Sequence, residues 1–150
     1  MIVDMAWRFA HFDELTPREV HDLFQLRVAV FVLEQNCPFQ DLDGADLDAW
    51  HLLGRAGNAL QAYCRLLAPG VKFPEASIGR VITAQQARGT GLGRVLMAEA
   101  LQRAQSLWPA QPIRIGAQSR LEKFYEGFGF KRASDEYIED GIPHIEMLRA

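Results

Sequence analysis

The hydrophobic pattern of the first third of the chain predicts a strand followed by a helix. Bulky apolar side chains alternate with other residues over 6–12, which is typical of a strand. Thr16, Pro17 and Glu19 then stand at the N-cap, first and third positions of a helix, where their side chains satisfy free amides. Apolar residues keep the helical period from Val20 onward, so this face should pack on the sheet. The face consists of Val20, Leu23, Phe24, the long stem of Arg27, Val28 and Phe31.

The next segment loses this pattern and then returns to alternation. Residues 34–48 contain Cys37-Pro38, Asp43-Gly44 and several acids, which predicts a loop, and loops of this length are commonly functional. Residues 50–55 and 60–67, joined by a turn at Gly57-Asn58, predict a hairpin.

The central stretch reads as strand, turn, helix and strand. Residues 77–83 predict a strand, and apolar residues at roughly helical spacing from Leu92 to Leu107 predict a helix. Residues 113–117 alternate again and predict another strand. Because a helical crossover separates the two strands, they can lie parallel and adjacent in one sheet.

The last part of the chain predicts a short helix and two strands. Leu121, Phe124, Tyr125 and Phe128 share a helical face that ends before Gly129. Residues 130–135 and 142–149 are predicted as strands, with Asp140-Gly141 in a turn. We expect residues 1–150 to form a single domain.

The glycine-rich segment between the central strand and helix predicts an anion site. Gly89, Gly91 and Gly93 let the backbone curl and turn its N–H groups toward one point at a helix N-terminus. A Walker A loop is absent, because Gly93 is followed by Arg94 and Val95. A dinucleotide fingerprint lacks its third glycine. A phosphate or diphosphate of another kind is the expected ligand.

Composition and charge narrow the class of protein. Of the 150 residues, 49% are hydrophobic and 23% are charged, which is the balance of a globular domain. The net charge of −3 and the lack of a Lys/Arg stripe argue against a nucleic-acid partner. No apolar run reaches the ~20 residues of a membrane span, so we expect no membrane partner and a cytoplasmic location. The four histidines show no metal-ligand spacing, and Cys37 and Cys64 are expected to be free thiols.

Four segments together resemble the GNAT N-acetyltransferases. Arg88, Gly91 and Gly93 match the family's acetyl-CoA loop, and the segment 121–130 matches its Tyr-to-Gly-Phe region. Segments 30–44 and 137–145 are similar to the smaller ElaA-type branch. The resemblance implies an α/β (α+β) fold: a central mixed, mostly antiparallel sheet of six to seven strands, about four helices and a splayed parallel strand pair. It leaves open whether two chains form a homodimer through their edge strands.

The resemblance also implies where acetyl-CoA, the cosubstrate, binds. The pantetheine arm would lie between strands 81–83 and 113–117, bonded by the main chain of Val81, Ile82 and Thr83. The amide of Ile82 or Thr83 could face the thioester oxygen. The diphosphate would rest on the turn formed by Arg88, Gly89, Thr90, Gly91, Leu92, Gly93 and Arg94, and Gln118 would touch the cofactor. The loop 34–48 would border the amine acceptor.

Acetyl transfer to an amine needs an acid for the leaving thiolate and a base for the amine. Tyr125 is the expected acid, since a phenol with a pKa of ~10 is protonated at neutral pH; otherwise it is a core aromatic. Glu34, His51 and His144 are candidate bases, although Glu34 could pair with an arginine and the histidines could be structural. Cys37 reads as a small apolar filler rather than an acyl relay.

We therefore expect an N-acetyltransferase that acts by direct transfer in a ternary complex. The alternatives are a non-catalytic acyl-CoA-binding module and a protein-interaction domain that uses the loop 34–48. Acidic residues suggest a cationic acceptor, although a solvated acidic surface is the commoner meaning of such charges. They are Asp41, Asp43, Asp46, Asp48, Glu139 and Asp140.

Overall fold

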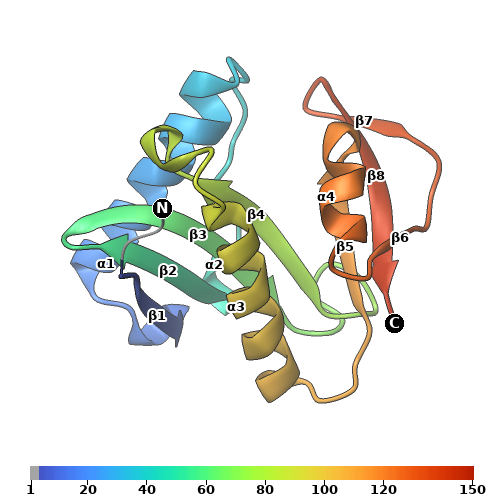
Figure 1. Cartoon of the computed structure of the whole chain (residues 1–150), viewed down its shortest axis with the longest axis horizontal. Coiled ribbons are helices and arrows are strands. Elements are labelled where there is room, and N and C mark those ends of the chain that lie inside the picture. The colour runs from blue at the N-terminus through green and yellow to red at the C-terminus, as the bar shows by residue number, and fades with distance from the viewer. Residues whose placement is uncertain (1–3) are drawn as a thin grey trace.

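A computed structural model describes residues 4–150, which form eight strands flanked by helices (Figure 1). The strands are β1 Ala6–His11, β2 Trp50–Ala56, β3 Ala59–Leu67, β4 Ser77–Thr83, β5 Ile113–Gln118, β6 Lys131–Arg132, β7 Tyr137–Glu139 and β8 Ile142–Arg149. The α-helices are α1 Pro17–Arg27, α2 Ala45–Asp48, α3 Leu92–Leu107 and α4 Glu122–Glu126. A π-helix, η2 Val28–Glu34, continues α1, and single 3₁₀ turns are η1 Phe12–Glu14, η3 Gln85–Ala87 and η4 Ser119–Leu121.

The strands form two four-stranded sheets that meet at one point. The first has the order β1-β2-β3-β4, and the second has the order β5-β8-β6 with β7 beside β8. A single parallel bridge joins the two sheets, between Ala76, just before β4, and Ile113, the first residue of β5. At this point the amide of Arg114 donates to the Ala76 carbonyl at 2.9 Å. Beyond it the two strands diverge (Figure 1). The expected splayed parallel pair is therefore present.

Two details of the C-terminal region differ from the sequence prediction. The predicted strand 130–135 shrinks to β6, and the hairpin partner of β8 across Asp140-Gly141 is β7, which was not predicted. After β6, the Ala133 amide still donates to the Glu146 carbonyl at 2.8 Å, but the Glu146 amide donates to the side-chain Oγ of Ser134 at 2.9 Å instead of to a backbone carbonyl, so the ladder ends there. The structure therefore has eight strands, against the six to seven expected, because β6 and β7 are short separate strands.

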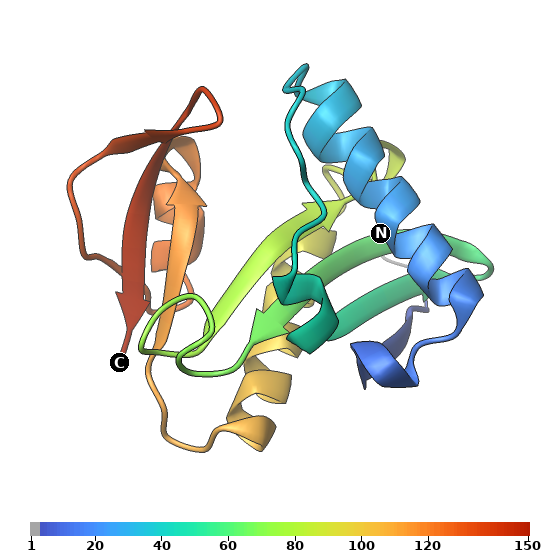
Figure 2. The ribbon, with the colours of Figure 1, turned by 180° about the vertical axis from the view of Figure 1, so that it is seen from behind.

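The first helix begins where the sequence predicts. Thr16 Oγ1 accepts from the Glu19 amide at 3.2 Å, and Glu19 Oε1 accepts from the Thr16 amide at 2.9 Å, which completes a capping box. The helix does not stop at Arg27 but widens into η2, which carries Phe31 and Glu34 toward the end of β4. Figure 2 shows this continuous helix lying across the face of the first sheet.

The alternation of the strands gives the first sheet a core on each face. One cluster packs α3 against the sheet and reaches α4 and β8; it includes Leu52, Cys64, Ile78, Leu96, Met97, Ala100, Phe130 and Met147. The other packs α1 and η2 on the opposite face and consists of Leu23, Val30, Leu53, Tyr63 and Ile82. Within residues 4–150, no helix is long and apolar enough to cross a membrane.

Candidate active site

The glycine-rich turn has the geometry of an anion site. Gly89 and Gly91 adopt positive φ of 79° and 86°, and Gly91 caps α3, its carbonyl accepting from the amides of Arg94 and Val95 at 3.2 and 3.3 Å. The amides of Leu92 and Gly93 precede these bonds, so they have no partner within the helix. A Cβ placed on Gly89 would meet nothing within 4 Å, so an incoming group can approach its backbone. These features fit the diphosphate of coenzyme A.

The Arg88 side chain does not lie over this turn. Its Nη2 donates to Glu34 Oε1 at 3.0 Å and to the Thr83 carbonyl at 3.3 Å, and its Nη1 donates to the other Glu34 oxygen. Glu34 therefore pairs with an arginine, which was the alternative to a role as base. The pair links the end of η2 to the glycine-rich turn. The Arg94 side chain is exposed on the first turn of α3, next to the free amides.

A cleft of about 110 Å³ opens where β4 and β5 diverge. It brings together four of the residues selected from the sequence: Val81, Gln118, Tyr125 and His144. Gln118 also accepts from Arg120 Nε at 3.0 Å. Phe31 and Phe39, from η2 and the following loop, also line this cleft, as do Glu139 and Asp140 of the β7–β8 hairpin.

A bulge in β4 decides which main-chain groups face the cleft. Tyr63 pairs with Ile82 and Arg65 pairs with Gly79, so two residues of β4, Arg80 and Val81, stand opposite one residue of β3. The amide of Ala84 donates to the Gln61 carbonyl at 2.8 Å.

Alternation from that bond turns the Ile82 main chain toward β3 and the main chains of Val81 and Thr83 away from it, and Val81 lines the cleft. The Thr83 carbonyl agrees with this, since it accepts from Arg88. Of the two amides expected at the thioester oxygen, that of Ile82 therefore points into the β3 ladder, and that of Thr83 points away from it.

Tyr125 lies at the floor of the cleft. It comes from α4, which ends in a turn where Gly129 has a φ of 90°, and its ring packs edge-on against Phe124 and Phe130 at centroid distances of 5.1 and 6.0 Å. Burial raises the pKa of the Tyr125 phenol above its ordinary value. The hydroxyl is therefore protonated at neutral pH, as a proton donor must be.

His144 stands on β8 with its tautomer set by the backbone. Its Nδ1 lies 2.7 Å from the Ile142 carbonyl, and because a carbonyl can only accept, Nδ1 carries the hydrogen. In the neutral ring, Nε2 then keeps its lone pair. Nε2 lies 3.6 Å from Glu139 Oε2, and the ring stacks on Tyr137 at 5.9 Å.

The structure does not bring His51 to the cleft. His51 is fully buried in β2, where Nδ1 accepts from the Tyr63 hydroxyl at 2.5 Å and Nε2 donates to the Asp46 carbonyl at 2.9 Å. Burial lowers the pKa of His51, so the ring is neutral and both nitrogens are engaged. Its role is to join β2, β3 and α2.

The sequence reading missed a buried network of charges beside the cleft. Arg27 is fully buried and donates to the carboxylates of Asp41 at 2.9 Å and Asp46 at 2.6 Å. Arg65 joins Asp46, at 2.9 Å, to Asp43, at 2.6 Å. The signal in the sequence was an arginine on the core face of a helix followed by a run of acids.

This network changes the meaning of the acidic residues. Burial would raise the pKa of Asp43, but its hydrogen bond with Arg65 and the nearby positive charges bring the pKa down to about 2. Asp41 and Asp46 are thus buried and paired with arginines, and the exposed Asp43 is paired with Arg65 and Arg80, so these three acids give no argument for a cationic acceptor. Among the acids that suggested one, Glu139 and Asp140 are the two that line the cleft with exposed side chains.

Cys37 lies between Gln35 and Phe39, two residues that line the cleft. Its Sγ donates to the Asp140 carbonyl at 2.9 Å and so links the loop after η2 to the β7–β8 turn. The thiol is thus used as a hydrogen-bond donor between two segments that both contribute residues to the cleft.

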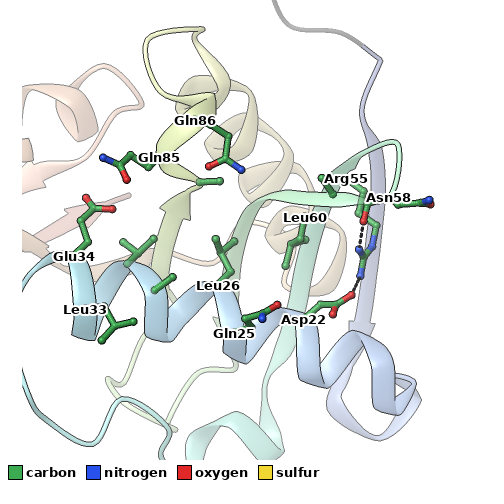
Figure 3. Close-up of a pocket in the computed structure, with 14 residues that line it drawn as sticks. Asp22, Gln25, Leu26, Leu33, Glu34, Arg55, Asn58, Leu60, Gln85 and Gln86 are labelled. Atoms are coloured by element: carbon green, nitrogen blue, oxygen red, sulfur yellow. Dashed lines mark hydrogen bonds and ion pairs between the residues drawn. The ribbon is translucent and has the colours of Figure 1, made fainter.

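A larger hollow of about 670 Å³ lies elsewhere, between the α1–η2 helix and the β2–β3 turn (Figure 3). Leu26 and Leu60 form part of its floor, and the pair Asp22–Arg55, at 2.9 Å, stands at one end. Apart from Glu34, none of the candidate catalytic or cofactor-binding residues lines it. The smaller cleft, which contains Tyr125 and His144, is therefore the candidate active site.

A sheet that splays between two parallel strands, with a glycine-rich turn after the first of them, defines the GNAT acyl-CoA N-acyltransferase fold. Comparison with known sequences agrees: the family model described as "Acetyltransferase (GNAT) domain" matches residues 68–149. The chain belongs to the GNAT acetyltransferase family.

Its relatives place it in the ElaA branch of that family. It is 45% identical to protein ElaA of Escherichia coli over 147 residues, which cover 97% of this chain and 96% of the relative. It is 39% identical to the UPF0039 protein sll0451 of Synechocystis, with the same coverage. Among solved structures, an acyl-CoA N-acyltransferase from Pseudomonas aeruginosa matches with a TM-score of 0.94 and 44% identity, covering 98% of this chain and all of that one.

Proposed function

We propose that the protein is an acetyl-CoA-dependent N-acetyltransferase that transfers the acetyl group directly to a primary amine while both substrates are bound. The observation that carries the proposal is the convergence of a protonated Tyr125, the main chain of Val81 and the Nε2 atom of His144 on one cleft. This cleft begins on the strand that leads into the glycine-rich turn. Family membership supports the transferase class, and the residues that line the cleft support the catalytic roles proposed below.

Acetyl-CoA supplies the activated acetyl group. The amides of the turn from Gly89 to Gly93 would hold its diphosphate, and the main-chain groups of Val81 and Thr83 would bond the pantetheine arm between β4 and β5. The Val81 N–H is the group we place at the thioester oxygen, where negative charge develops. Each of these donors is fixed by the backbone before the substrate arrives.

The two proton transfers are assigned to two different residues of the cleft. The amine nitrogen forms a bond to the acetyl carbon as the carbon–sulfur bond breaks, and His144 Nε2 accepts the proton that the nitrogen loses. Tyr125 donates its hydroxyl proton to the departing sulfur. Phe31, Phe39 and the β7–β8 turn form the wall against which the acceptor would bind.

The test is thiol release from acetyl-CoA in the presence of a panel of primary amines. Tyr125→Phe should lower the rate by about 10²- to 10⁴-fold without changing the dissociation constant of CoA, because only the donated proton is removed. Tyr63→Phe is the matched control, since it removes a hydroxyl from an equally buried tyrosine outside the cleft and should leave the rate unchanged.

Two outcomes would count against the proposal. Binding of acetyl-CoA without thiol release for any amine would favour the non-catalytic acyl-CoA-binding module. A protein whose melting temperature does not rise with CoA would have no coenzyme site at all.

A further inference from the structure

Arg80 combines an unusual backbone with an unusual side chain. It is one of the two bulged residues of β4, and its φ is 52°, a left-handed value that residues with a Cβ rarely adopt. Glycine would suit this position sterically, yet an arginine occupies it. Something in the surrounding structure therefore holds the conformation in place.

The side chain of Arg80 reaches from the bulge to the loop that follows η2. Its Nε lies 2.8 Å from Asp41 Oδ1, and its Nη2 donates to the Asp41 carbonyl at 3.0 Å and lies 3.4 Å from Asp43 Oδ2. Both the main chain and the side chain of Asp41 thus contact one guanidinium group. A planar fork of donors suits such contacts better than a single ammonium group would.

Asp41 is itself anchored deep in the protein. It is 2% exposed, and its other carboxylate oxygen accepts from the buried Arg27. Through this residue, the bulge is tied to the interior of the α1–η2 layer. The same tie sets the position of the loop that borders the acceptor side of the cleft, since Asp41, Arg80 and Val81 all line it.

We propose that Arg80 is a positioning residue that locks the β4 bulge so that the Val81 N–H points at the thioester oxygen. Val81 directly follows Arg80, so rotation of the Arg80 backbone out of its left-handed conformation would turn the Val81 amide away from the cleft. The contact with Asp41 prevents that rotation. It also links the loop on the acceptor side to the amide on the thioester side.

The inference rests on the proposed function and is tested by isotope-edited infrared spectroscopy of acetyl-CoA labelled with ¹³C at its carbonyl. A hydrogen bond to this oxygen lowers the stretching frequency of the bound carbonyl relative to acetyl-CoA in buffer. Arg80→Gln should lose that shift and lower kcat by about a hundredfold with an active amine, as a misplaced donor does, while the dissociation constant of CoA stays unchanged. Arg80→Lys, which keeps a charge opposite Asp41, should recover part of both.

Arg114→Gln is the matched control. Arg114 is as exposed as Arg80, at 20% against 21%, and also joins two carboxylates, those of Glu75 and Glu146, but it does not line the cleft. It should keep the full infrared shift and the full kcat.

The outcomes separate this inference from the proposed function. If the unaltered protein binds neither CoA nor acetyl-CoA, the proposed function fails. If it binds both and Arg80→Gln keeps the shift and kcat, or loses CoA affinity in parallel with kcat, the role of Arg80 is refuted alone. Should Arg80→Gln not fold, as judged by circular dichroism, an unchanged shift and kcat in Arg80→Lys overturn the inference, and a partial loss supports it.

Discussion

Removing the buried Arg27 guanidinium should destabilise the protein strongly. Arg27→Met keeps much of the length of the side chain but deletes four hydrogen bonds, three to the carboxylates of Asp41 and Asp46 and one to the Asp41 carbonyl. Breaking a buried ion pair from one side typically costs 3–5 kcal/mol, because the remaining charge stays desolvated. Here each carboxylate retains one arginine, Arg80 or Arg65, so we expect a loss at the lower end, about 3 to 4 kcal/mol.

That loss is large against the 5–15 kcal/mol that typically separates a folded domain from its unfolded state. It should lower the melting temperature by roughly 6 to 16 °C for a domain of this size. Urea unfolding should show a lower midpoint with an unchanged slope, since the surface exposed on unfolding is the same.

Arg114→Met serves as the control for this measurement. It also removes an arginine held by two carboxylates, but Arg114 and its partners keep contact with water, so the midpoint should move much less. Equal shifts for Arg27→Met and Arg114→Met would refute the reasoning, because burial of the network would then carry no energetic weight.

Three further predictions follow from the same structure. Gly89→Ala should weaken CoA binding at least tenfold in calorimetry, because a Cβ would enter the open approach to the turn, whereas Gly57→Ala, at a similar positive φ of 62° on the β2–β3 turn, should strain the backbone without changing CoA affinity. His144→Asn should slow acetyl transfer most at pH values below the pKa of the amine, and the deficit should shrink above it, because a neutral amine needs less help from a base; an equal deficit at every pH would contradict the assigned role. The folded-state pKa of Asp43, about 2, lies below its ordinary value of 3.8, so the unfolded chain binds more protons and stability should rise with pH between about 2 and 4 and then level off; Asp43→Asn should flatten this rise in acid unfolding curves.

The parts of the fold that the sequence determined are those that depend on near neighbours in the chain. The capping box from Thr16 to Glu19 spans four residues, the β2–β3 hairpin needs alternation and a tight turn, and the glycine-rich turn needs residues free to adopt positive φ. Each of these requirements concerns residues that are close together in the sequence. The same is true of the Tyr125 segment, where a short helix ends at Glu126 and the turn after it closes at Gly129 with positive φ.

The assignment of roles within the site depended on contacts between distant segments. Glu34 and His51 were as plausible a base as His144 in the sequence, but Arg88, 54 residues away, engages Glu34, and the fold buries His51 against Tyr63. Only His144 has a ring nitrogen left in the cleft.

The charge network and the β4 bulge were also decided by the tertiary structure. Arg27 reads as a helical residue with an apolar stem until Asp41 and Asp46 fold over it, and the conformation of Arg80 has no local cause. Charges in a sequence attract one another weakly through water, whereas a fold that excludes water from them makes their pairing obligatory. Tertiary packing therefore determined which of the charged and titratable side chains have structural roles and which line the cleft.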